Sequence, residues 1–244
     1  MRTRQKVRRV VAVVSTALFP VTLYYFSPFL SIEGLSSGIV TGSLVLFALL
    51  FLASLFLGRA FCAWVCPAGA LQEIVLGFRG RAVKRTRVNW IKWLVWSPWV
   101  LALVFVVFRS GGVRTVNLTW RTWHGISVSD PHSLVILAVV AALFAGLALA
   151  VGRRAGCHTV CWMAPFMVLG GRLQAFFGWP ALRIAAKAGA CQDCGACSRA
   201  CPMSIEVAAL AKSGHVESTD CILCASCADG CPHGALRLTF RSGH

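Results

Sequence analysis

The C-terminal part of the chain contains a repeated cysteine motif that restricts the possible folds more than any other feature. The motif C-x2-C-x2-C-x3-C-P occurs at Cys191–Pro202 and again at Cys221–Pro232. Three thiolates at these short spacings can bind one face of an iron–sulfur cube, whereas the fourth completes a different cube. The proline after each fourth cysteine ends the local helix. The spacing therefore predicts a small domain folded around two 4Fe–4S clusters.

The expected ligands are crossed between the two motifs. The first cluster is expected on Cys191, Cys194, Cys197 and Cys231. The second is expected on Cys221, Cys224, Cys227 and Cys201. A zinc ribbon is the alternative, but zinc needs two C-x2-C pairs and would leave the remaining cysteines without a role. The motifs therefore favour two 4Fe–4S clusters.

This segment resembles bacterial two-cluster ferredoxins, including the Cys-Pro-x-Gly-Ala-Leu run from Cys231 to Leu236. One departure is Ser226, where the first motif has Ala196, and it leaves the prediction unchanged. The resemblance implies an α+β two-cluster ferredoxin-like domain, which we place at residues 185–244.

The remainder of the chain is too apolar for a soluble protein. Hydrophobic residues make up 57% of the sequence and charged residues only 13%, against roughly half and a quarter in soluble domains. The net charge of +16 is compatible with a nucleic acid partner. However, the positive residues gather at the ends of apolar segments, where membrane topology and anionic lipid headgroups explain them. The composition therefore predicts a membrane protein that does not bind nucleic acid.

Four apolar segments are long enough to span a bilayer. They predict an all-α membrane part with helices at about residues 10–30, 35–57, 90–108 and 132–151, arranged as two tandem hairpins. Pro20 and Pro28 are tolerated in the first helix as kinks. Residues 162–180 are apolar but interrupted by Arg172, so we expect an interfacial or re-entrant helix there. The predicted transmembrane domain covers residues 1–182.

The distribution of Lys and Arg predicts the orientation of these helices. The N-terminal tail holds five, residues 58–92 hold seven and the chain after Val151 holds nine, whereas the opposite side holds three. The positive-inside rule then places both termini in the cytoplasm. Cluster thiolates need a reducing compartment, and this requirement also places the cysteine-rich segment in the cytoplasm. Both arguments predict a multi-pass protein of the cytoplasmic (inner) membrane, with its ferredoxin domain in the cytoplasm.

A second cysteine motif comes after each predicted hairpin. The residues Arg59, Ala60, Cys62, Val65 and Cys66 recur as Arg154, Ala155, Cys157, Val160 and Cys161, at a constant offset of 95 residues. The copies differ after their second cysteine, since Pro67 comes directly after Cys66 whereas the proline after Cys161 is delayed to Pro165. Both copies face the same side, so the membrane part is predicted to be a parallel tandem repeat.

Cysteines at i and i+4 share one face of a helix, so two such pairs can bring four thiols together. The four are Cys62, Cys66, Cys157 and Cys161. Ordinary buried cysteines are the simple alternative, but the match in number and spacing favours ligation or redox chemistry. A third cluster, another metal site and a thiol redox pair all stay open.

The whole chain is similar to the NapH/MauN/NosR group of membrane polyferredoxins. The similarity rests on the C-x3-C-P motif at a membrane boundary, the four predicted spans and the C-terminal two-cluster segment. The run from Cys157 to Phe166 is similar to a subgroup with a modified second motif. The resemblance implies electron transfer between the quinone pool and iron–sulfur or periplasmic partners, or a role in metalloenzyme maturation.

The histidines and carboxylates of the membrane part give weaker indications. No histidine lies in the middle of a predicted span, so haem is not expected. Glu73 and His158 lie near the cysteine repeats and form a candidate quinone site on the cytoplasmic side. The outer loop Arg109–His132 is another candidate, although a solvated loop explains it more simply. Since the spans lack haem ligands to carry electrons across about 30 Å of hydrocarbon, we expect redox chemistry on the cytoplasmic side.

The sequence thus predicts a membrane-bound iron–sulfur protein that relays electrons between cytoplasmic redox partners and the quinone pool, as an electron-transfer subunit of a quinone-linked oxidoreductase. The expected partners are the lipid bilayer, a quinone or quinol and another redox protein. Two alternatives stay open. One is an iron–sulfur assembly or regulatory protein for the maturation of another redox enzyme, and the other is a thiol-based membrane redox sensor.

Overall fold

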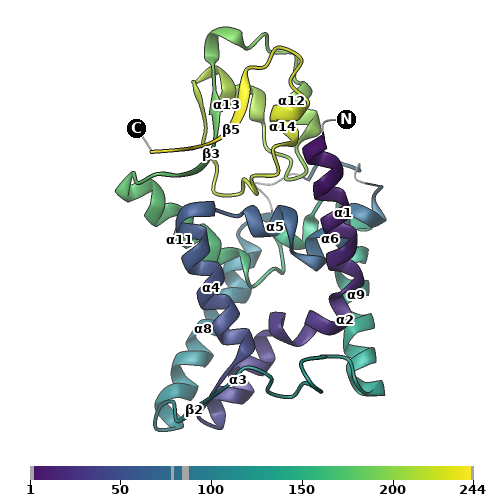
Figure 1. Cartoon of the computed structure of the whole chain (residues 1–244), viewed down its shortest axis with the longest axis vertical. Helices are drawn as coiled ribbons and strands as arrows, with labels where there is room; N and C mark the ends of the chain where they lie inside the picture. Colours follow the sequence, from purple (N-terminus) through teal and green to yellow (C-terminus); the bar gives the residue numbers. More distant parts are fainter. Residues whose placement is uncertain (1–2, 78–79, 84–87, 243–244) are drawn as a thin grey trace.

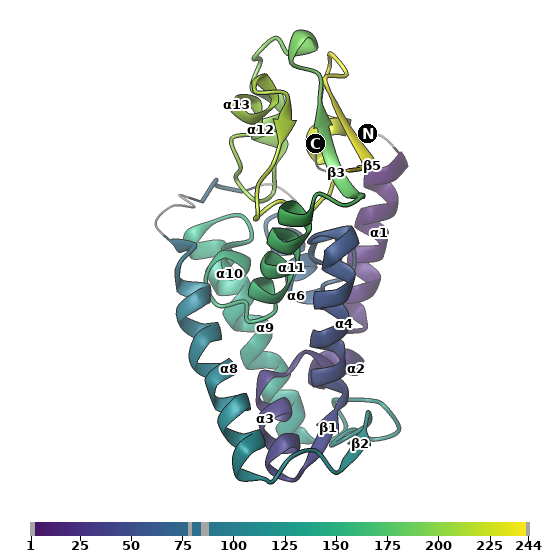
Figure 2. The ribbon, with the colours of Figure 1, turned by 90° about the vertical axis from the view of Figure 1, so that its left-hand side faces the viewer.

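The computed structural model describes residues 3–77, 80–83 and 88–242, which form two regions stacked end to end (Figures 1 and 2). Long helices make up the lower region in both views, and a small sheet with short helices makes up the upper region. The two ends of the chain lie at the upper end (Figure 1). Five basic residues used to predict the orientation lie outside the described residues: Arg2, Arg79, Lys84, Arg85 and Arg87.

Two helices in the lower region are long and apolar enough to cross a membrane. They are α8 (Ile91–Arg109) and α9 (Pro131–Val151), where the sequence predicts the third and fourth spans. Asp130 caps α9, because its side chain accepts a hydrogen bond from the Ser133 N–H at 2.8 Å. Pro131 follows in the first turn, where its missing N–H has no helical partner to lose.

The predicted first span at residues 10–30 is not one continuous helix. It is divided into α1 (Thr3–Ala17), α2 (Phe19–Thr22), a 3₁₀ turn η1 (Leu23–Phe26) and α3 (Pro28–Ser36), with a 60° bend after Ala17. Pro20 and Pro28 each lie at the start of a new helix, where a proline cannot continue the preceding hydrogen-bond ladder. Ser27 caps α3 by accepting the Leu30 N–H. The prolines therefore break the helix instead of kinking it.

The predicted second span at residues 35–57 is also shorter than expected. The helix α4 (Gly42–Leu57) has 16 residues, about 24 Å of rise against a hydrocarbon thickness of about 30 Å. Residues before it form a short strand β1 (Ile39–Thr41), which pairs in parallel with β2 (Thr115–Asn117). The structure therefore has two full-length apolar helices and two shorter or bent segments beside them.

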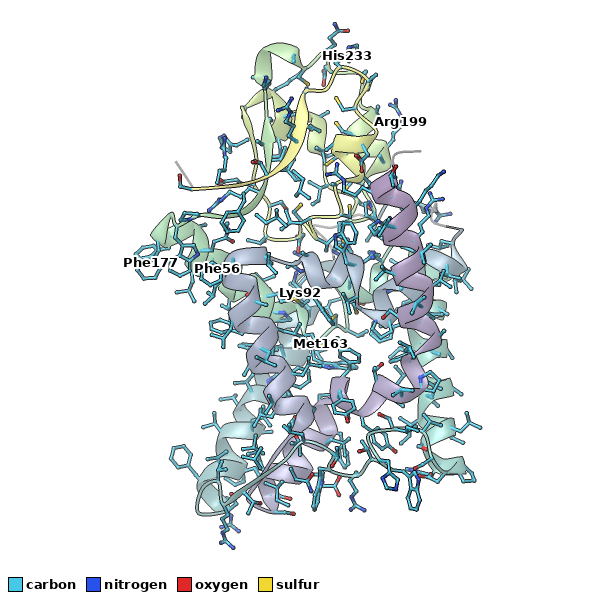
Figure 3. All side chains as sticks on the ribbon, viewed as in Figure 1. Phe56, Lys92, Met163, Phe177, Arg199 and His233 are labelled. Atoms are coloured by element: carbon cyan, nitrogen blue, oxygen red, sulfur yellow. The ribbon has the colours of Figure 1, made fainter. Side chains whose placement is uncertain are left out.

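The helix α11 (Ala164–Phe177) covers most of the predicted interfacial segment. It packs along α4, and a Cβ on Gly170 would collide with the Ser54 hydroxyl, so the glycine permits this close approach. Met163, just before the helix, lies in the interior of the lower region (Figure 3). Phe56 and Phe177 project outward below the upper region (Figure 3). The helix therefore rises from the interior to the boundary between the two regions.

The upper region is built on an antiparallel sheet in the order β4-β3-β5. Its elements are β3 (Ala181–Ala186), η2 (Ala188–Ala190), α12 (Ala196–Ala200), α13 (Val207–Lys212), β4 (His215–Val216), α14 (Ser226–Asp229) and β5 (Leu236–Arg241). The pairing of β3 with β5 starts at Ala181, so the mixed α/β region begins before the predicted residue 185.

The two regions share a continuous core. Within the lower region, Phe47, Trp99 and Phe166 form an aromatic cluster between α4, α8 and α11, with ring centroids 5.4–5.9 Å apart. The buried residues continue through the cysteine motifs into the upper region, where Ile184 and Ile222 belong to the same hydrophobic cluster. The upper region is therefore packed against the helices, and the cysteine motifs lie at this junction.

Candidate metal centres

The first group of cysteines lines a small cavity in the upper region. It consists of Cys191, Cys194, Cys197 and Cys231. Asp193 and Gly195 have positive φ angles of 53° and 68°, which lets the loop curl so that its three cysteines face inward. Cys194 is exposed, so this group lies close to the surface.

The second group lines a separate cavity nearer the helices. It consists of Cys201, Cys221, Cys224 and Cys227. The loop repeats the conformation of the first, since Leu223 and Ala225 have φ angles of 53° and 58° at the equivalent positions. Each cavity is therefore lined by the first three cysteines of one motif and the fourth cysteine of the other.

Burial controls the chemistry of the second group. Removing a thiolate from water raises the pKa of Cys221 to about 12 and that of Cys201 to about 11. Such thiols are inert as nucleophiles but become thiolates when a metal binds. In the described part of the chain, no three His, Cys, Asp or Glu side chains converge as ligands of a single metal ion. A 4Fe–4S cube is compatible with wider spacing, because each cysteine binds a different iron.

The third group brings together the two C-x3-C motifs of the helical region. Its members are Cys62 in α5 (Ala60–Trp64), Cys66 before α6 (Pro67–Val75), Cys157 in α10 (Ala155–His158) and Cys161 after α10, and each is at least 94% buried. The backbone repeats at the 95-residue offset, since the Cys66 N–H donates to Phe61 O and the Cys161 N–H donates to Gly156 O, both at 3.0 Å. The tandem repeat predicted from the sequence is therefore a repeat of local structure.

The four thiols of this group are close enough to influence one another. Burial and the neighbouring Cys62, Cys157 and Cys161 raise the pKa of Cys66 well above its ordinary value. Burial together with Cys157 and Cys62 raises the pKa of Cys161 to about 12. Four thiolates would repel one another in this dry site, so the sulfurs can ionise together only where a bound metal centre compensates their charge.

Two buried arginines, one from each repeat, flank the third group. Arg154 donates to Glu73 Oε1 and to the Cys62 carbonyl, at 2.6 and 2.5 Å. Arg59 donates to Asp220 Oδ1 at 3.3 Å. Burial lowers the pKa of Arg59, but the nearby Cys62 thiol and Asp220 outweigh it and the net pKa is raised.

The Arg59 guanidinium is only partly satisfied. Its Nε and Nη2 are buried and have no hydrogen-bond partner among the described residues. A buried donor without an acceptor is costly, so native structures rarely contain one. An anionic cluster on the adjacent cysteines would supply sulfur acceptors for these N–H groups. The third group therefore fits a 4Fe–4S cluster in both its donor set and its charge.

The candidate quinone residues Glu73 and His158 lie beside the third group but are enclosed. Glu73 accepts from Arg8 Nη1 at 2.9 Å and from Arg154, and these guanidinium groups outweigh burial and lower its pKa. His158 is fully buried near Asp220. Neither residue lines the large cavity of about 520 Å³ that reaches Cys66 and Cys161. Both residues are therefore part of the packed interior of the described chain and do not face a space that could hold a quinone.

The loop before Cys221 connects the second and third groups. Asp220 accepts from Arg59 and from Lys92, which lies in the interior at the start of α8 and donates at 2.8 Å (Figure 3). Leu223 reaches the backbone of Gly58, where an added Cβ would lie 3.1 Å from its Cδ1. The sequence pattern predicts a place for Arg59 in the repeat and no role for Asp220. Asp220 is nevertheless a charged residue directly before the cluster motif, and this position could have marked it as a contact of the cysteine groups.

Two family models match the chain. A 4Fe–4S binding domain matches residues 39–86, which include Cys62 and Cys66. A 4Fe–4S dicluster domain matches residues 190–236, which include all eight cysteines of the first two groups. The first match lies in the helical region, where the third group is found.

Several curated proteins are similar over most of the chain. YccM of Escherichia coli is 26% identical over 87% of this chain and 62% of its own length. The methylamine utilization ferredoxin-type protein MauN of Methylobacillus flagellatus is 27% identical, over 78% of this chain and 65% of its own length. The ferredoxin-type protein NapH of Escherichia coli is 25% identical over 93% of this chain and 79% of its own length.

The chain spans less than two thirds of the length of YccM and of the Methylobacillus MauN. No solved structure matches. The cysteine geometry, the two 4Fe–4S matches and these relatives agree with the sequence resemblance. The chain is similar to ferredoxin-type proteins that include NapH and MauN, and 4Fe–4S domain models match two of its segments.

Proposed function

We propose that the chain is a membrane-bound electron-transfer protein that holds three 4Fe–4S clusters. The first would bind Cys191, Cys194, Cys197 and Cys231, and the second would bind Cys201, Cys221, Cys224 and Cys227. The third would bind Cys62, Cys66, Cys157 and Cys161. The observation that carries this proposal is the contact of Asp220, next to Cys221, with Arg59 beside the third group.

Bound clusters would supply one-electron transfer, and the protein would set their order. The first group is the closest to solvent because Cys194 is exposed, so it suits exchange with a soluble redox partner. The second group lies between the first and the helices, and the third lies within the helical region. This order supports a relay from the surface into the membrane part.

The four-thiol group suits ligation better than thiol exchange. A redox-sensing thiol needs a low pKa and access to solvent. Cys66 and Cys161 have raised pKa values and are buried. This argues against the thiol-sensor alternative, and the match of a 4Fe–4S binding domain to residues 39–86 supports the cluster.

We further propose a multi-pass arrangement in the cytoplasmic membrane. The bent segment α1–η1 and the short α4 would form the first hairpin, and α8 with α9 the second, giving a transmembrane domain followed by a ferredoxin domain that begins with β3 at Ala181. The exposed aromatic residues Phe56 and Phe177 near Trp179 support a membrane boundary at this level. The basic residues at the ends of the apolar segments support a cytoplasmic ferredoxin domain.

The proposed activity is electron exchange between a cytoplasmic redox partner and the quinone pool. The apolar cavity beside Cys66 and Cys161 supports a lipophilic redox partner. A maturation role for another redox enzyme remains the second candidate. Cluster reduction by a quinol would favour the relay, whereas reducible clusters with no response to quinol would favour maturation.

Iron and acid-labile sulfide per chain test the cluster proposal. The protein would be purified without oxygen, together with a variant carrying Ser at the four positions of the third group. We expect about twelve iron atoms in the parent and about eight in the variant. A value of about eight in both would leave the third group without a cluster. A variant with Ser at Cys191, Cys194, Cys197 and Cys231 is the matched control, and we expect it to lose the same number.

A further inference from the structure

A cavity of about 520 Å³ runs through the helical region from the third cysteine group toward the outer loop. The bend after Ala17 creates it, because Phe19, Leu23 and Phe26 turn away from the axis of α1 and line one wall. Ile136 and Val140 of α9 line another wall. The volume lies within the range of about 300–1,000 Å³ that is usual for small-molecule sites.

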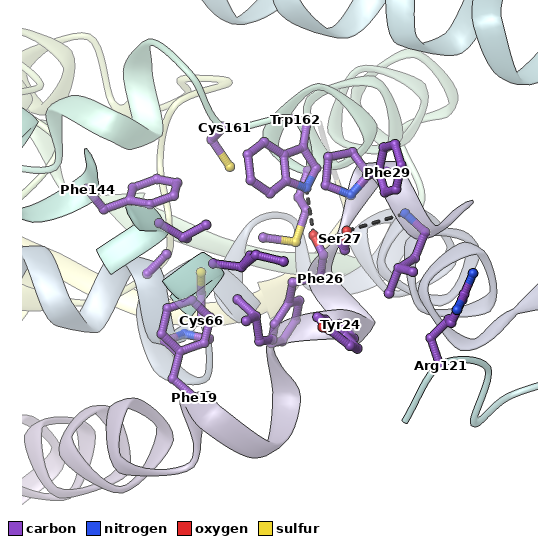
Figure 4. A pocket seen from close by; sticks show the side chains of 18 of the residues that line it. Phe19, Tyr24, Phe26, Ser27, Phe29, Cys66, Arg121, Phe144, Cys161 and Trp162 are labelled. Atoms are coloured by element: carbon purple, nitrogen blue, oxygen red, sulfur yellow. Dashed lines mark hydrogen bonds between the residues drawn. The ribbon is translucent and has the colours of Figure 1, made fainter. Parts of the chain in front are cut away.

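One end of the cavity touches both C-x3-C motifs. Cys66 and Cys161 line this end, and Figure 4 shows both side chains there with Phe144 nearby. Trp162 extends along the cavity, and its indole N–H donates to the Phe26 carbonyl at 2.8 Å (Figure 4). The ring centroids of Phe144 and Trp162 are 6.3 Å apart. This end is an aromatic pocket in direct contact with two candidate cluster ligands.

The other end of the cavity is lined by ionisable side chains. Arg121 lies there, far from the two cysteines in Figure 4, and its guanidinium forms an ion pair with Glu33 at 2.5 Å. Asp130 and His132, at the start of α9, complete this rim and are exposed. The sequence favours a solvated loop here and a quinone site at Glu73 and His158, but the structure places the loop residues on a cavity that reaches the cysteines.

We propose that this cavity is the quinone site, with the ring of the quinone held in the aromatic pocket next to Cys66 and Cys161. The inference rests on the proposed electron-relay function and locates its lipophilic substrate. A quinone ring needs an electron partner within reach, a flat apolar pocket and a route for protons. The cavity combines these three features, whereas a lipid tail would need neither the contact with the cysteines nor the ionisable rim.

Oxidation of a quinol to a quinone at this site releases two electrons and two protons. Cys66 and Cys161 at the inner end would help to hold the group that supplies one-electron transfer. The protons are released toward the rim, where Asp130 and His132 are in contact with water. Reduction of a quinone is the same reaction in reverse. The residues of the chain provide the pocket and the proton route.

Filling the cavity tests the location. Val140 lines the cavity, whereas its neighbour Val139 points outward with 61% of its surface exposed. Val140→Trp should block the site, and Val139→Trp adds the same side chain outside it. Ile136→Trp and Val135→Trp form a second pair of the same design, since Val135 is also 61% exposed. The full-length protein would be reconstituted in nanodiscs for every variant.

Two readouts separate this inference from the proposed function. The first is photolabelling by an azido-ubiquinone, mapped by mass spectrometry, with excess decylubiquinone as competitor. The second is bleaching of cluster absorbance by decylubiquinol and menadiol, compared with bleaching by dithionite. We expect competed labelling within residues 19–30, 66–68, 136–144 or 161–163, which line the cavity. We also expect about a tenfold or larger loss of labelling and of quinol-driven bleaching in the cavity-filled variants. Dithionite bleaching and iron content should be unchanged.

Equal labelling and quinol-driven bleaching in Val140→Trp and the parent would overturn the location while leaving the relay intact. Competed labels that map elsewhere, or labelling that decylubiquinone does not displace, would do the same. A parent protein that contains its clusters but responds to neither quinol would overturn the quinone relay itself. Competed labelling of the cavity in a protein with too little iron would support the site and count against the clusters.

Discussion

The second and third cysteine groups are built differently, although both bind a 4Fe–4S cluster in our proposal. The second group lies in the α/β region, and the third lies among the helices. In the second group, the four cysteines come from residues 201–227, on loops whose backbone curls through Leu223 and Ala225. In the third group, they come from two motifs 95 residues apart and are flanked by the buried arginines Arg59 and Arg154. A local loop can therefore bring thiolates together by its own backbone geometry, whereas a site assembled between distant helices also needs buried positive charge.

The largest expected effect tests the crossed ligands. Cys231→Ser should remove the cluster shared with Cys191, Cys194 and Cys197, and so lower the iron content by about four atoms per chain. Electron paramagnetic resonance should show the same lost signal in Cys231→Ser and Cys194→Ser, and a different lost signal in Cys201→Ser and Cys224→Ser. If Cys231→Ser instead matched Cys224→Ser, each motif would bind its own cluster and the two groups would be assigned wrongly.

The next effect concerns the buried charges of the third group. Arg154→Met leaves Glu73 buried with one cationic partner instead of two, and breaking a buried ion pair costs about 3–5 kcal/mol. Thermal unfolding of the detergent-purified protein should show this loss, and Arg154→Met combined with Glu73→Gln should recover part of it. The exposed pair of Lys212 and Asp193 offers the control, because Lys212→Met should leave unfolding nearly unchanged. Equal stability of Arg154→Met and Lys212→Met would contradict the role given to buried charge.

A smaller effect is expected on redox potential. Arg59→Gln removes a positive charge whose Nε–H and Nη2–H groups lack partners in the described residues, so it should disfavour the reduced, more negative cluster of the third group. We expect its potential to fall by about 60 mV, a tenfold change for one electron. Potentiometric titration followed by electron paramagnetic resonance would measure this, with Arg237→Gln on the exposed face of β5 as control. An unchanged potential would show that Arg59 serves packing alone.

The smallest effect is a dependence of stability on pH. The guanidinium groups of Arg154 and Arg8 hold the pKa of Glu73 below its ordinary value despite burial. The stabilisation is therefore complete above the unfolded pKa of about 4.3 and is lost as the pH falls through the lower folded value. The difference in unfolding temperature between the parent and Glu73→Gln should be constant near neutral pH and shrink below about pH 4. Glu206→Gln, an exposed carboxylate, should show no such difference.

Parts of this structure could be predicted because their signals are local. The spacing within each cysteine motif decides which thiols a short loop can turn inward, and the crossed groups result from it. The unbroken apolar runs before Arg109 and after Asp130 likewise predict α8 and α9. The span at 10–30 was predicted as one helix, because the effect of Pro20 depends on whether the surrounding helices support a kink or a break.

Sequence patterns alone are enough to predict the eight ferredoxin-type cysteines, the 95-residue repeat of the helical motifs and the two long apolar helices, since each pattern depends on residues that are near one another in the chain. Other contacts are visible only in the folded chain. Arg59 and Arg154 face the third group, Arg8 and Arg154 form ion pairs with Glu73, and the outer loop shares a cavity with Cys66 and Cys161. Among these contacts, Arg8 and Glu73 are 65 residues apart, and Arg154 and Cys62 are 92 residues apart. They depend on how the broken first helix packs against α9 and the upper region, which no short stretch of sequence specifies.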